Sequence, residues 1–391
     1  MLVDEIKEHV VHVMIPFWKN LKDEEFGGFF GLVDFNLNLD KKAPKGCILN
    51  SRILWFFSNA YKVFQDESLL LYATHAYNFL LKQCYDVENG GVYWSLNYDG
   101  TVLDSTKHTY NQAFAIYALS SYYGVTGEKQ ALETAYELFE LIEHKCRDEI
   151  GYLEAFNSTF HPIENDKLSE EGIIADKTMN TLLHVFEAYT ELYRVTKDQN
   201  IGNKMRYIMD IIEENVFNIE KRRQEVFFDS NMNSLLDLHS YGHDIEAAWL
   251  VDRGCEILAD TVYSSKMRKI TDVLEKEIYT IAFNGHSIAN ECKEGIVDHT
   301  RVWWAQAEAM VGFMNGYLKD RDKSYYLEAV IKIWQFIKEH MIDSRENSEW
   351  FYDVDSAGNP SSKKAIVEPW KCPYHNGRMC FEIIRRAENA S

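Results

Sequence analysis

Apolar residues recur at three- and four-residue spacing along almost the whole chain, which is the pattern of helices with a buried face. Twelve segments carry this pattern, and no Gly/Ser-rich linker or low-complexity run divides them. The predicted helices span residues 3–19, 48–64, 67–84, 108–123, 128–145, 177–195, 200–216, 243–258, 264–282, 301–318, 323–341 and 374–386. Proline supplies only 6 of 391 residues, as expected of a chain built from long helices.

Between the predicted helices, short aromatic segments recur and indicate β-hairpins. Glycine-marked copies are centred at residues 28, 91 and 151, about 60 residues apart, and one sixth of the 391 residues is about 65. Each repeat therefore comprises an outer helix, a short hairpin and an inner helix. One such pair cannot bury its own apolar face, but six pairs can close into a ring. We predict an all-α fold, an (α/α)6 barrel with short β-hairpins in the connecting loops, which spans residues 1–391 as a single catalytic domain. An open solenoid of helix pairs is the structural alternative.

The charge balance narrows the class of partner. With 41 basic and 61 acidic residues the formal net charge is −20, and the pI is near 5.1. Nucleic acid and anionic membrane surfaces attract basic proteins, so neither is an expected partner. No stretch approaches the ~18 consecutive apolar residues of a membrane span, and the amino terminus has no basic segment followed by an apolar run. The seven cysteines are odd in number and scattered, which favours reduced thiols. We expect a cytoplasmic monomer.

The residues with chemical potential lie at the start of the predicted inner helices, near positions 48, 108, 177, 241, 301 and 373. In a ring of helix pairs the equivalent ends of the inner helices face one mouth, so polar residues in their first two turns should meet in one cavity. Charged and amide groups are rarely buried without partners, which makes this set a poor choice for a core. The set comprises Arg52, Tyr110, Asn180, His184, His243, Glu246, Trp303, Trp304, Glu308, Trp370 and His375. Because adjacent helix positions do not share a face, we expect one of Trp303 and Trp304 to pack and the other to line the cavity.

These residue types suit sugar chemistry without a bound cofactor. Tryptophan faces suit sugar rings, and the chain has neither a phosphate loop, a dinucleotide fingerprint nor a G-x-S-x-G elbow. His243 and Glu246 lie one helical turn apart, but no second pair completes a zinc set, so no metal is expected. Imidazole is a base of near-neutral pKa and Arg52 is a cation for an enediolate oxygen, which together suit proton transfer beside the carbonyl of a ring-opened sugar. The paired carboxylates would instead suit a glycoside hydrolase, and a non-catalytic sugar-binding barrel is a third alternative.

Five segments resemble the cellobiose 2-epimerase family, part of the N-acylglucosamine 2-epimerase superfamily of (α/α)6 barrels. They are RILWF at 52–56, ADKTMN at 175–180, SYGHDIEA at 240–247, VWWAQAE at 302–308 and WKCPYHNGRMC at 370–380. The resemblance implies reversible C2 epimerisation of the reducing-end glucose of cellobiose and related β-1,4-linked disaccharides, lactose included, without metal or nucleotide. The expected partner is thus a small reducing disaccharide.

The same resemblance implies a role for each site residue. His243 and His375 would be the acid/base pair, while Arg52 and His184 would bind and polarise O1 and O2 of the open intermediate. The remaining residues would bind substrate or orient the histidines: Tyr110, Asn180, Glu246 and Glu308 at hydroxyls or imidazoles, and Trp304 and Trp370 on the sugar rings, with Trp303 beside them. Mannose isomerases and N-acylglucosamine 2-epimerases share the histidines and the arginine, so aldose–ketose isomerisation and monosaccharide epimerisation are alternatives. Transfer by two bases and transfer by one base around a rotating intermediate are both open.

Overall fold

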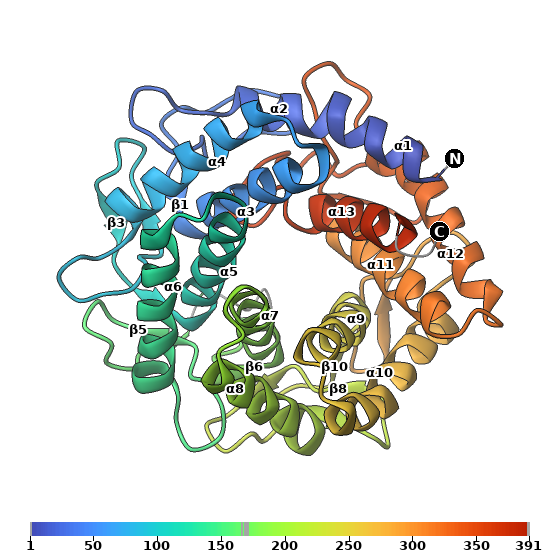
Figure 1. The fold of residues 1–391 in the computed structure, drawn as a ribbon. Coiled ribbons are helices and arrows are strands. Elements are labelled where there is room, and N and C mark those ends of the chain that lie inside the picture. Colours follow the sequence, from blue (N-terminus) through green and yellow to red (C-terminus); the bar gives the residue numbers. More distant parts are fainter. Residues whose placement is uncertain (1, 166, 168–171, 389–391) are drawn as a thin grey trace.

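The computed structural model describes residues 2–165, 167 and 172–388, and their helices form a closed double ring (Figure 1). The inner ring consists of α3 (Cys47–Phe64), α5 (Thr109–Thr126), α7 (Met179–Thr196), α9 (Tyr241–Leu258), α11 (Trp303–Lys319) and α13 (His375–Glu388). The outer ring consists of α1 (Leu2–His9), α2 (Ile15–Asn20), α4 (Glu67–Phe79), α6 (Lys129–Leu141), α8 (Gln199–Ile211), α10 (Thr261–Ile281) and α12 (Ser324–Phe336). The predicted (α/α)6 barrel is confirmed.

Most outer helices contain one wide, π-helical turn. These turns are Val10–Met14, which joins α1 to α2, and Leu80–Cys84, Ile142–Cys146, Ile212–Val216 and Ile337–Met341, which follow α4, α6, α8 and α12. After α4 the turn closes with a bond from the Tyr85 N–H to the carbonyl of Leu80 at 2.9 Å. The residue after the turn is extended, so the wide turn ends the helix and directs the chain toward the hairpin end of the ring.

The two rings differ in burial because they differ in the number of neighbours. Helix α5 is buried at every residue from Thr109 to Tyr122, since it has an inner helix on each side and an outer helix behind it. Helix α8 buries one stripe, which includes Ile201, Met205 and Ile208 at helical spacing. An all-round buried helix and a one-sided helix are what the inner and outer positions of such a ring require.

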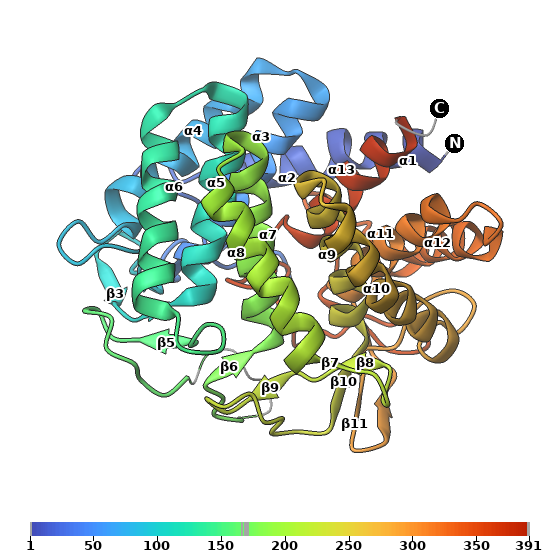
Figure 2. The same ribbon diagram turned by 60° about the horizontal axis from the view of Figure 1, so that its bottom comes forward.

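Short antiparallel sheets gather at one end of the ring (Figure 2). Three pairs are hairpins within one repeat: β2 (Ser95–Leu96) with β3 (Val102–Asp104), β7 (Phe217–Asn218) with β8 (Arg223–Gln224), and β11 (Glu291–Lys293) with β12 (Ile296–Asp298). The other pairs join one repeat to the next: β1 (Lys45–Gly46) with β2, β4 (Lys107–His108) with β5 (Ala155–Phe156), β6 (Lys177–Thr178) with β9 (Phe227–Phe228), β10 (Leu238–Ser240) with β11, and β13 (Arg301–Val302) with β14 (Asp353–Val354). The hairpin prediction thus holds, but the strand before each of these inner helices pairs with the following repeat.

Backbone pairing also closes the ring between the first and last repeats. The Val33 N–H donates to the carbonyl of Val367 at 3.1 Å, and the Ile366 N–H donates to the carbonyl of Val33 at 2.9 Å. Helix α1 packs on α13, and Lys7 pairs with Glu388 at 3.0 Å, so the two ends of the chain lie side by side (Figure 1). An open solenoid would leave these two repeats apart, so this alternative is excluded.

An ion pair with a buried lysine holds the segment before three of the inner helices. Lys45 lies 2.5 Å from Asp23, Lys107 lies 2.9 Å from Asp86, and Lys177 lies 2.7 Å from Asp148. Each aspartate also accepts at least one backbone N–H of its own turn. Strand pairing and ion pairing therefore act together on the residues that lead into these helices, and they fix where the first helical turns begin.

Toward the opposite end of the ring, in the carboxyl halves of the inner helices, charged side chains form ion pairs between helices. Arg253 of α9 bonds Glu382 of α13 and lies 3.6 Å from Glu191 of α7, which also accepts from Arg194 at 2.8 Å. These ion pairs link α7, α9 and α13 at that end of the ring.

Two expectations about the chain as a whole concern its thiols and its hydropathy. All seven cysteines lie in described residues as free thiols, six of them buried. Among the described helices, none combines the length and the apolar composition that crossing a membrane would require.

Candidate active site

The first turns of the inner helices surround a cavity of about 390 Å³ at the strand end of the ring. Nine of the eleven predicted site residues line it: Arg52, Tyr110, Asn180, His184, His243, Trp303, Trp304, Trp370 and His375. The other two, Glu246 and Glu308, are fully buried next to the histidines and are not part of the lining. The convergence predicted from repeat phase is therefore present, with the two carboxylates one layer deeper.

His243 is held by a serine from the strand before its helix. Its Nδ1 lies 2.7 Å from Oγ of Ser240, the last residue of β10, and its ring packs on Trp304 with centroids 4.6 Å apart. Burial, with a smaller contribution from His184, lowers the pKa of His243 to about 3. When the serine hydroxyl accepts from Nδ1–H, Nε2 is the basic nitrogen of the neutral imidazole.

His375 is held in the same way by a carboxylate. Its Nδ1 lies 2.8 Å from Oε1 of Glu308, and its ring is 5.5 Å from that of Trp304. Burial, together with the guanidinium groups of Arg378 and Arg52, holds the pKa of His375 well below its usual range. The carboxylate favours the tautomer with the proton on Nδ1, so Nε2 is again the free base.

His184, the third histidine, lies on α7. Its Nδ1 is 2.9 Å from Oε2 of Glu187, and its Nε2 is 3.9 Å from Oε1 of Glu246. Burial lowers the pKa of His184, although the hydrogen bond to Glu187 opposes the shift. Burial thus favours the neutral form of all three histidines, and each has its Nδ1 engaged by a different partner.

Arg52 is held in an aromatic cage. Its guanidinium carbon lies 4.2 Å from the ring centre of Phe114 and 4.6 Å from that of Tyr374, and Nη2 donates to the hydroxyl of Tyr110 at 2.8 Å. Burial raises the pKa of Tyr110 to about 12, so its hydroxyl keeps a proton to donate. A cation to which no carboxylate of the described residues is bonded, next to a phenol, is suited to an oxygen that gains negative charge.

The two deeper carboxylates share one guanidinium, that of Arg378. Glu308 accepts from Arg378 at 2.8 Å and from the indole N–H of Trp249 at 2.9 Å, and Glu246 also bonds Arg378. Burial, with the charge of Glu308, raises the pKa of Glu246 to about 8. The geometry favours Glu308 as a residue that orients a histidine over one that binds a sugar hydroxyl.

The same carboxylates raise the question of a metal. Ligand atoms of Glu246, Glu308 and His375 lie within 4.8 Å of one another, which is close enough for a cation. Arg378 already bonds both carboxylates and lies between them, so a metal ion would have to displace a buried guanidinium. The donor set is therefore better suited to an internal ion cluster than to a metal ion.

The tryptophans differ from expectation in one respect. Both Trp303 and Trp304 line the cavity, although Trp303 is only 3% exposed and packs on Tyr352 with ring centres 4.5 Å apart. The indole N–H of Trp303 and the side-chain oxygen of Asn180 are buried without a hydrogen-bond partner among the described residues. A large ring can pack on one neighbour and still line the cavity, which the facing rule does not take into account. Both orphaned atoms suit sugar hydroxyls.

Sequence reasoning missed the rim and the layer beneath the histidines. The rim residues come from the strands and loops: Lys167, Val226, Phe227, Leu238, Ser240, Asn290, Glu291, Asp298, Thr300, Val302, Tyr352, Asp353 and Lys364. Beneath the site, Glu187 and Arg378 each lie one turn after a predicted histidine, at i+3 from His184 and His375. That spacing was a usable signal, whereas the rim depends on which repeats pair through their strands.

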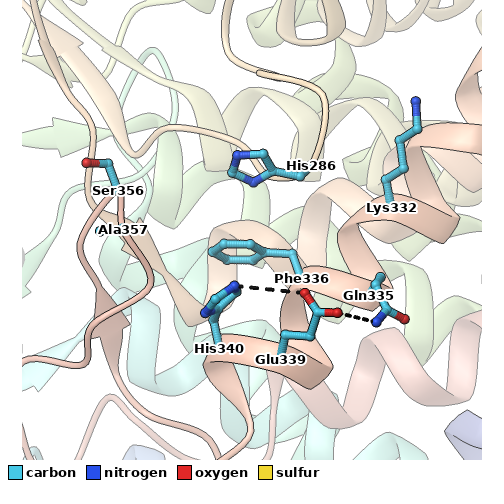
Figure 3. A pocket seen from close by; sticks show the side chains of 8 residues that line it. All are labelled: His286, Lys332, Gln335, Phe336, Glu339, His340, Ser356 and Ala357. Carbon is cyan, nitrogen blue, oxygen red and sulfur yellow. Dashed lines mark hydrogen bonds and ion pairs between the residues drawn. The ribbon is translucent and has the colours of Figure 1, made fainter.

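A second cavity of similar volume, about 390 Å³, lies on the outer wall (Figure 3). It is lined by side chains of α12 and its π turn, among them Phe336 and His340, and by His286. His286 stacks on Phe336 with ring centres 5.2 Å apart, and its two nitrogens contact Asn284 and Ser287. None of the predicted site residues reaches this cavity.

Fold and site together define the class, an (α/α)6 barrel with a histidine- and tryptophan-lined cavity at one mouth. The chain belongs to the N-acylglucosamine 2-epimerase (GlcNAc 2-epimerase) family, which matches residues 8–376.

Individual members of the family are similar to this chain over its whole length. A cellobiose 2-epimerase of Ruminococcus albus is 47% identical over 386 residues, which is 99% of each chain. The crystal structure of a sugar epimerase from a ruminal bacterium superposes with a TM-score of 0.97 at 46% identity and covers 99% of each chain. The structure of cellobiose 2-epimerase from Bacillus thermoamylovorans B4167 gives 0.94 at 43% identity, with 98% of this chain and 99% of that chain covered. The resemblance inferred from the five sequence segments is confirmed.

Proposed function

We propose that this protein is a carbohydrate epimerase that inverts C2 of the reducing-end glucose of cellobiose and of related β-1,4-linked disaccharides, converting lactose to epilactose. The carrying observation is that His243 and His375 line one cavity with the buried cation Arg52, each with Nδ1 engaged and no hydrogen bond from Nε2 to any described residue. The similarity to the cellobiose 2-epimerases supports the choice of substrate.

The reaction begins from the open-chain sugar, because only a free aldehyde acidifies the neighbouring C–H. Nε2 of one histidine takes the C2 proton, the C–H electron pair forms the C1–C2 double bond, and the carbonyl electrons move to O1. Arg52 and the Tyr110 hydroxyl stabilise the negative charge on O1 of this cis-enediolate. A protonated Nε2 then gives a proton to the opposite face of C2, which yields the mannose epimer. The donor is the same histidine if the open intermediate turns, or the other histidine once it has taken a proton from water. No electrons enter or leave, so no redox cofactor is needed.

The depressed pKa values serve this chemistry. A general base must be unprotonated, and burial keeps His243 and His375 neutral at the pH of the cytoplasm. Once the base has taken the proton, the imidazolium lies beside a newly formed anion in a site of low dielectric, which favours its return of the proton.

The remaining lining residues suit sugar binding. Trp304 lies against both histidines, and Trp370 lies between Trp94 and Tyr110 with ring centres 5.6 and 5.9 Å away. A volume of about 390 Å³ is in the range of small-ligand sites. The unpartnered polar atoms of Trp303 and Asn180 would bind hydroxyls.

The alternatives differ in what they need from the same residues. A hydrolase needs two carboxylates on either side of a glycosidic bond, whereas Glu246 and Glu308 are bonded to Arg378 below the cavity. Aldose–ketose isomerisation shares the enediolate and would differ by delivering the proton to C1. A binding protein would have no use for two histidines kept neutral.

Product analysis with cellobiose, mannose and N-acetylglucosamine in deuterated water separates these functions. We expect glucosyl-mannose from cellobiose with deuterium at C2. Epimer without deuterium would refute the proton-transfer mechanism, free glucose would indicate hydrolysis, net ketose would indicate isomerisation, and turnover of a monosaccharide alone would refute the disaccharide assignment.

Histidine variants test the assignment of the bases. His243→Ala and His375→Ala should each lower kcat by about 10²- to 10⁴-fold, because a missing general base costs that much. His144→Ala is the matched control, since His144 is exposed on the outer ring beside Glu140. Full activity in either site variant would remove that histidine from the mechanism.

A further inference from the structure

A single guanidinium connects the groups beneath the candidate active site. Arg378 is 1% exposed and lies one turn after His375 on α13. It bonds Glu187 from α7, Glu246 from α9, Glu308 from α11 at 2.8 Å, and the hydroxyl of Tyr374. Its carbon is also 4.3 Å from the ring centre of Tyr374 and 4.8 Å from that of Trp249. Four inner helices therefore meet at one side chain that does not line the cavity.

Two of the carboxylates on this guanidinium each hold a histidine. Glu187 lies 2.9 Å from Nδ1 of His184, and Glu308 lies 2.8 Å from Nδ1 of His375. Glu246 lies between them, with its Oε1 at 3.9 Å from a nitrogen of each ring. The two imidazoles come from helices on different sides of the ring, and Arg378 is the group common to both of their partners.

The charge of Arg378 decides what these carboxylates can do. An ionised carboxylate only accepts hydrogen bonds, so it selects the tautomer with the proton on Nδ1 and leaves Nε2 basic. A protonated carboxyl can instead donate to Nδ1, which places the ring proton on Nε2 and removes the base. Burial raises the pKa of Glu308, and Arg378 makes the largest opposing contribution. Burial acts on Glu187 in the same direction, and there Arg378 helps to hold the pKa well below its usual range.

We propose that Arg378 is a positioning residue that sets the orientation and tautomer of both His184 and His375 through Glu187 and Glu308. It touches no substrate. The inference rests on the proposed function only for its kinetic consequence, since the tautomers are a property of the free protein.

The test uses Arg378→Lys and Arg378→Gln in the full chain. Lysine keeps the charge but offers a compact ammonium in place of a planar fork, so it cannot bond three carboxylates in the same geometry. Glutamine removes the charge. We expect kcat on cellobiose to fall by about 10²-fold in Arg378→Gln and by less in Arg378→Lys, with KM changed by less than about threefold, because a misplaced catalytic group lowers turnover without removing a substrate contact.

Arg386→Lys is the matched control. Arg386 lies two turns further along α13, is 7% exposed, pairs with Glu382 at 3.2 Å and approaches the same Trp249 ring at 5.7 Å. It contacts none of the three histidines, so its variant should lose comparable stability and keep kcat within about twofold of the original.

A second readout is independent of catalysis. Long-range ¹H–¹⁵N spectra of the side chains should show His184 and His375 with the proton on Nδ1 in the unchanged protein, and a shift of one or both toward the Nε2-protonated form in Arg378→Gln. If Arg378→Gln folds with unchanged kcat and tautomers, the proposal is wrong. If it does not fold, Arg378→Lys decides, and unchanged kcat with unchanged tautomers again refutes it. A tautomer shift in a protein that turns over no cellobiose would uphold the positioning role while refuting the proposed function.

Discussion

Replacing Glu308 by glutamine removes one charge and turns one acceptor into a donor at the centre of the site. The carboxylate accepts three bonds: from His375 at 2.8 Å and Arg378 at 2.8 Å on Oε1, and from Trp249 at 2.9 Å on Oε2. An amide has one oxygen, so it can face either the first two donors or the third. The amide oxygen should face His375 and Arg378, because one of these donors is charged and a charged bond is about twice as strong as a neutral one.

This orientation sets the magnitude of both effects. The Trp249 N–H then faces an NH₂ group in a buried place, and an unsatisfied buried donor costs about 1–3 kcal/mol of unfolding free energy. His375 keeps an acceptor but exchanges a charge-assisted bond for a neutral one, a loss of about 1–2 kcal/mol, which corresponds to roughly 5- to 30-fold in kcat if it is felt at the transition state. The opposite orientation would donate to Nδ1 of His375 and cost about 10⁴-fold, as wrong-tautomer variants do.

Steady-state epimerisation of cellobiose and urea unfolding measure the two effects of Glu308→Gln. Glu275→Gln is the control, because Glu275 is a 1% exposed carboxylate of the outer ring that accepts from Asn315 at 3.0 Å and from Lys319 at 2.9 Å. It should lose similar stability and keep kcat. A kcat for Glu308→Gln within threefold of the unchanged protein would refute the claim that this carboxylate orients His375.

Three further outcomes follow from individual contacts. Trp303→Phe keeps the ring packing but removes the unpartnered indole N–H. KM for cellobiose should rise about fivefold, the equivalent of one hydrogen bond, while thermal stability stays unchanged. An unchanged KM would show that no sugar hydroxyl bonds this N–H. Burial lowers the pKa of His9 to about 4, below its value in the unfolded chain. The unfolded state therefore gains the proton first, and the unfolding free energy falls as pH drops from 6.5 toward 4. Urea unfolding at several pH values should show that up to about 3 kcal/mol of this loss is absent in His9→Gln. Lys45→Met leaves Asp23 as a buried unpaired charge and should lower the unfolding free energy by about 3–5 kcal/mol. Adding Asp23→Asn should restore part of this loss. Equal stability of the single and double variants would contradict the ion-pair account.

The sequence by itself determined the architecture and most of the site lining, because both follow from local periodicity. Helix spacing is set by residues three and four apart, and the predicted helices end within a few residues of the observed ones, as at 48–64 against Cys47–Phe64 and 200–216 against Gln199–Val216. Repeat phase then placed His184, His243 and His375 at one mouth without any knowledge of contacts. The prediction that only one of Trp303 and Trp304 lines the cavity was wrong. The rule that adjacent helix positions face different sides does not take into account the size of an indole ring.

Tertiary structure decided the connections between repeats and the layer beneath the histidines. Which strands pair depends on closure of the ring. Val33 and Val367, more than three hundred residues apart in the chain, are hydrogen-bonded through their backbones, and β1 pairs with β2 of the next repeat. The positions of Glu308 below the cavity and of Arg378 among three carboxylates depend on how four helices approach one point. Such a cluster is stable only when every buried charge finds its partner, and partners contributed by α7, α9, α11 and α13 can be identified only when the ring is assembled.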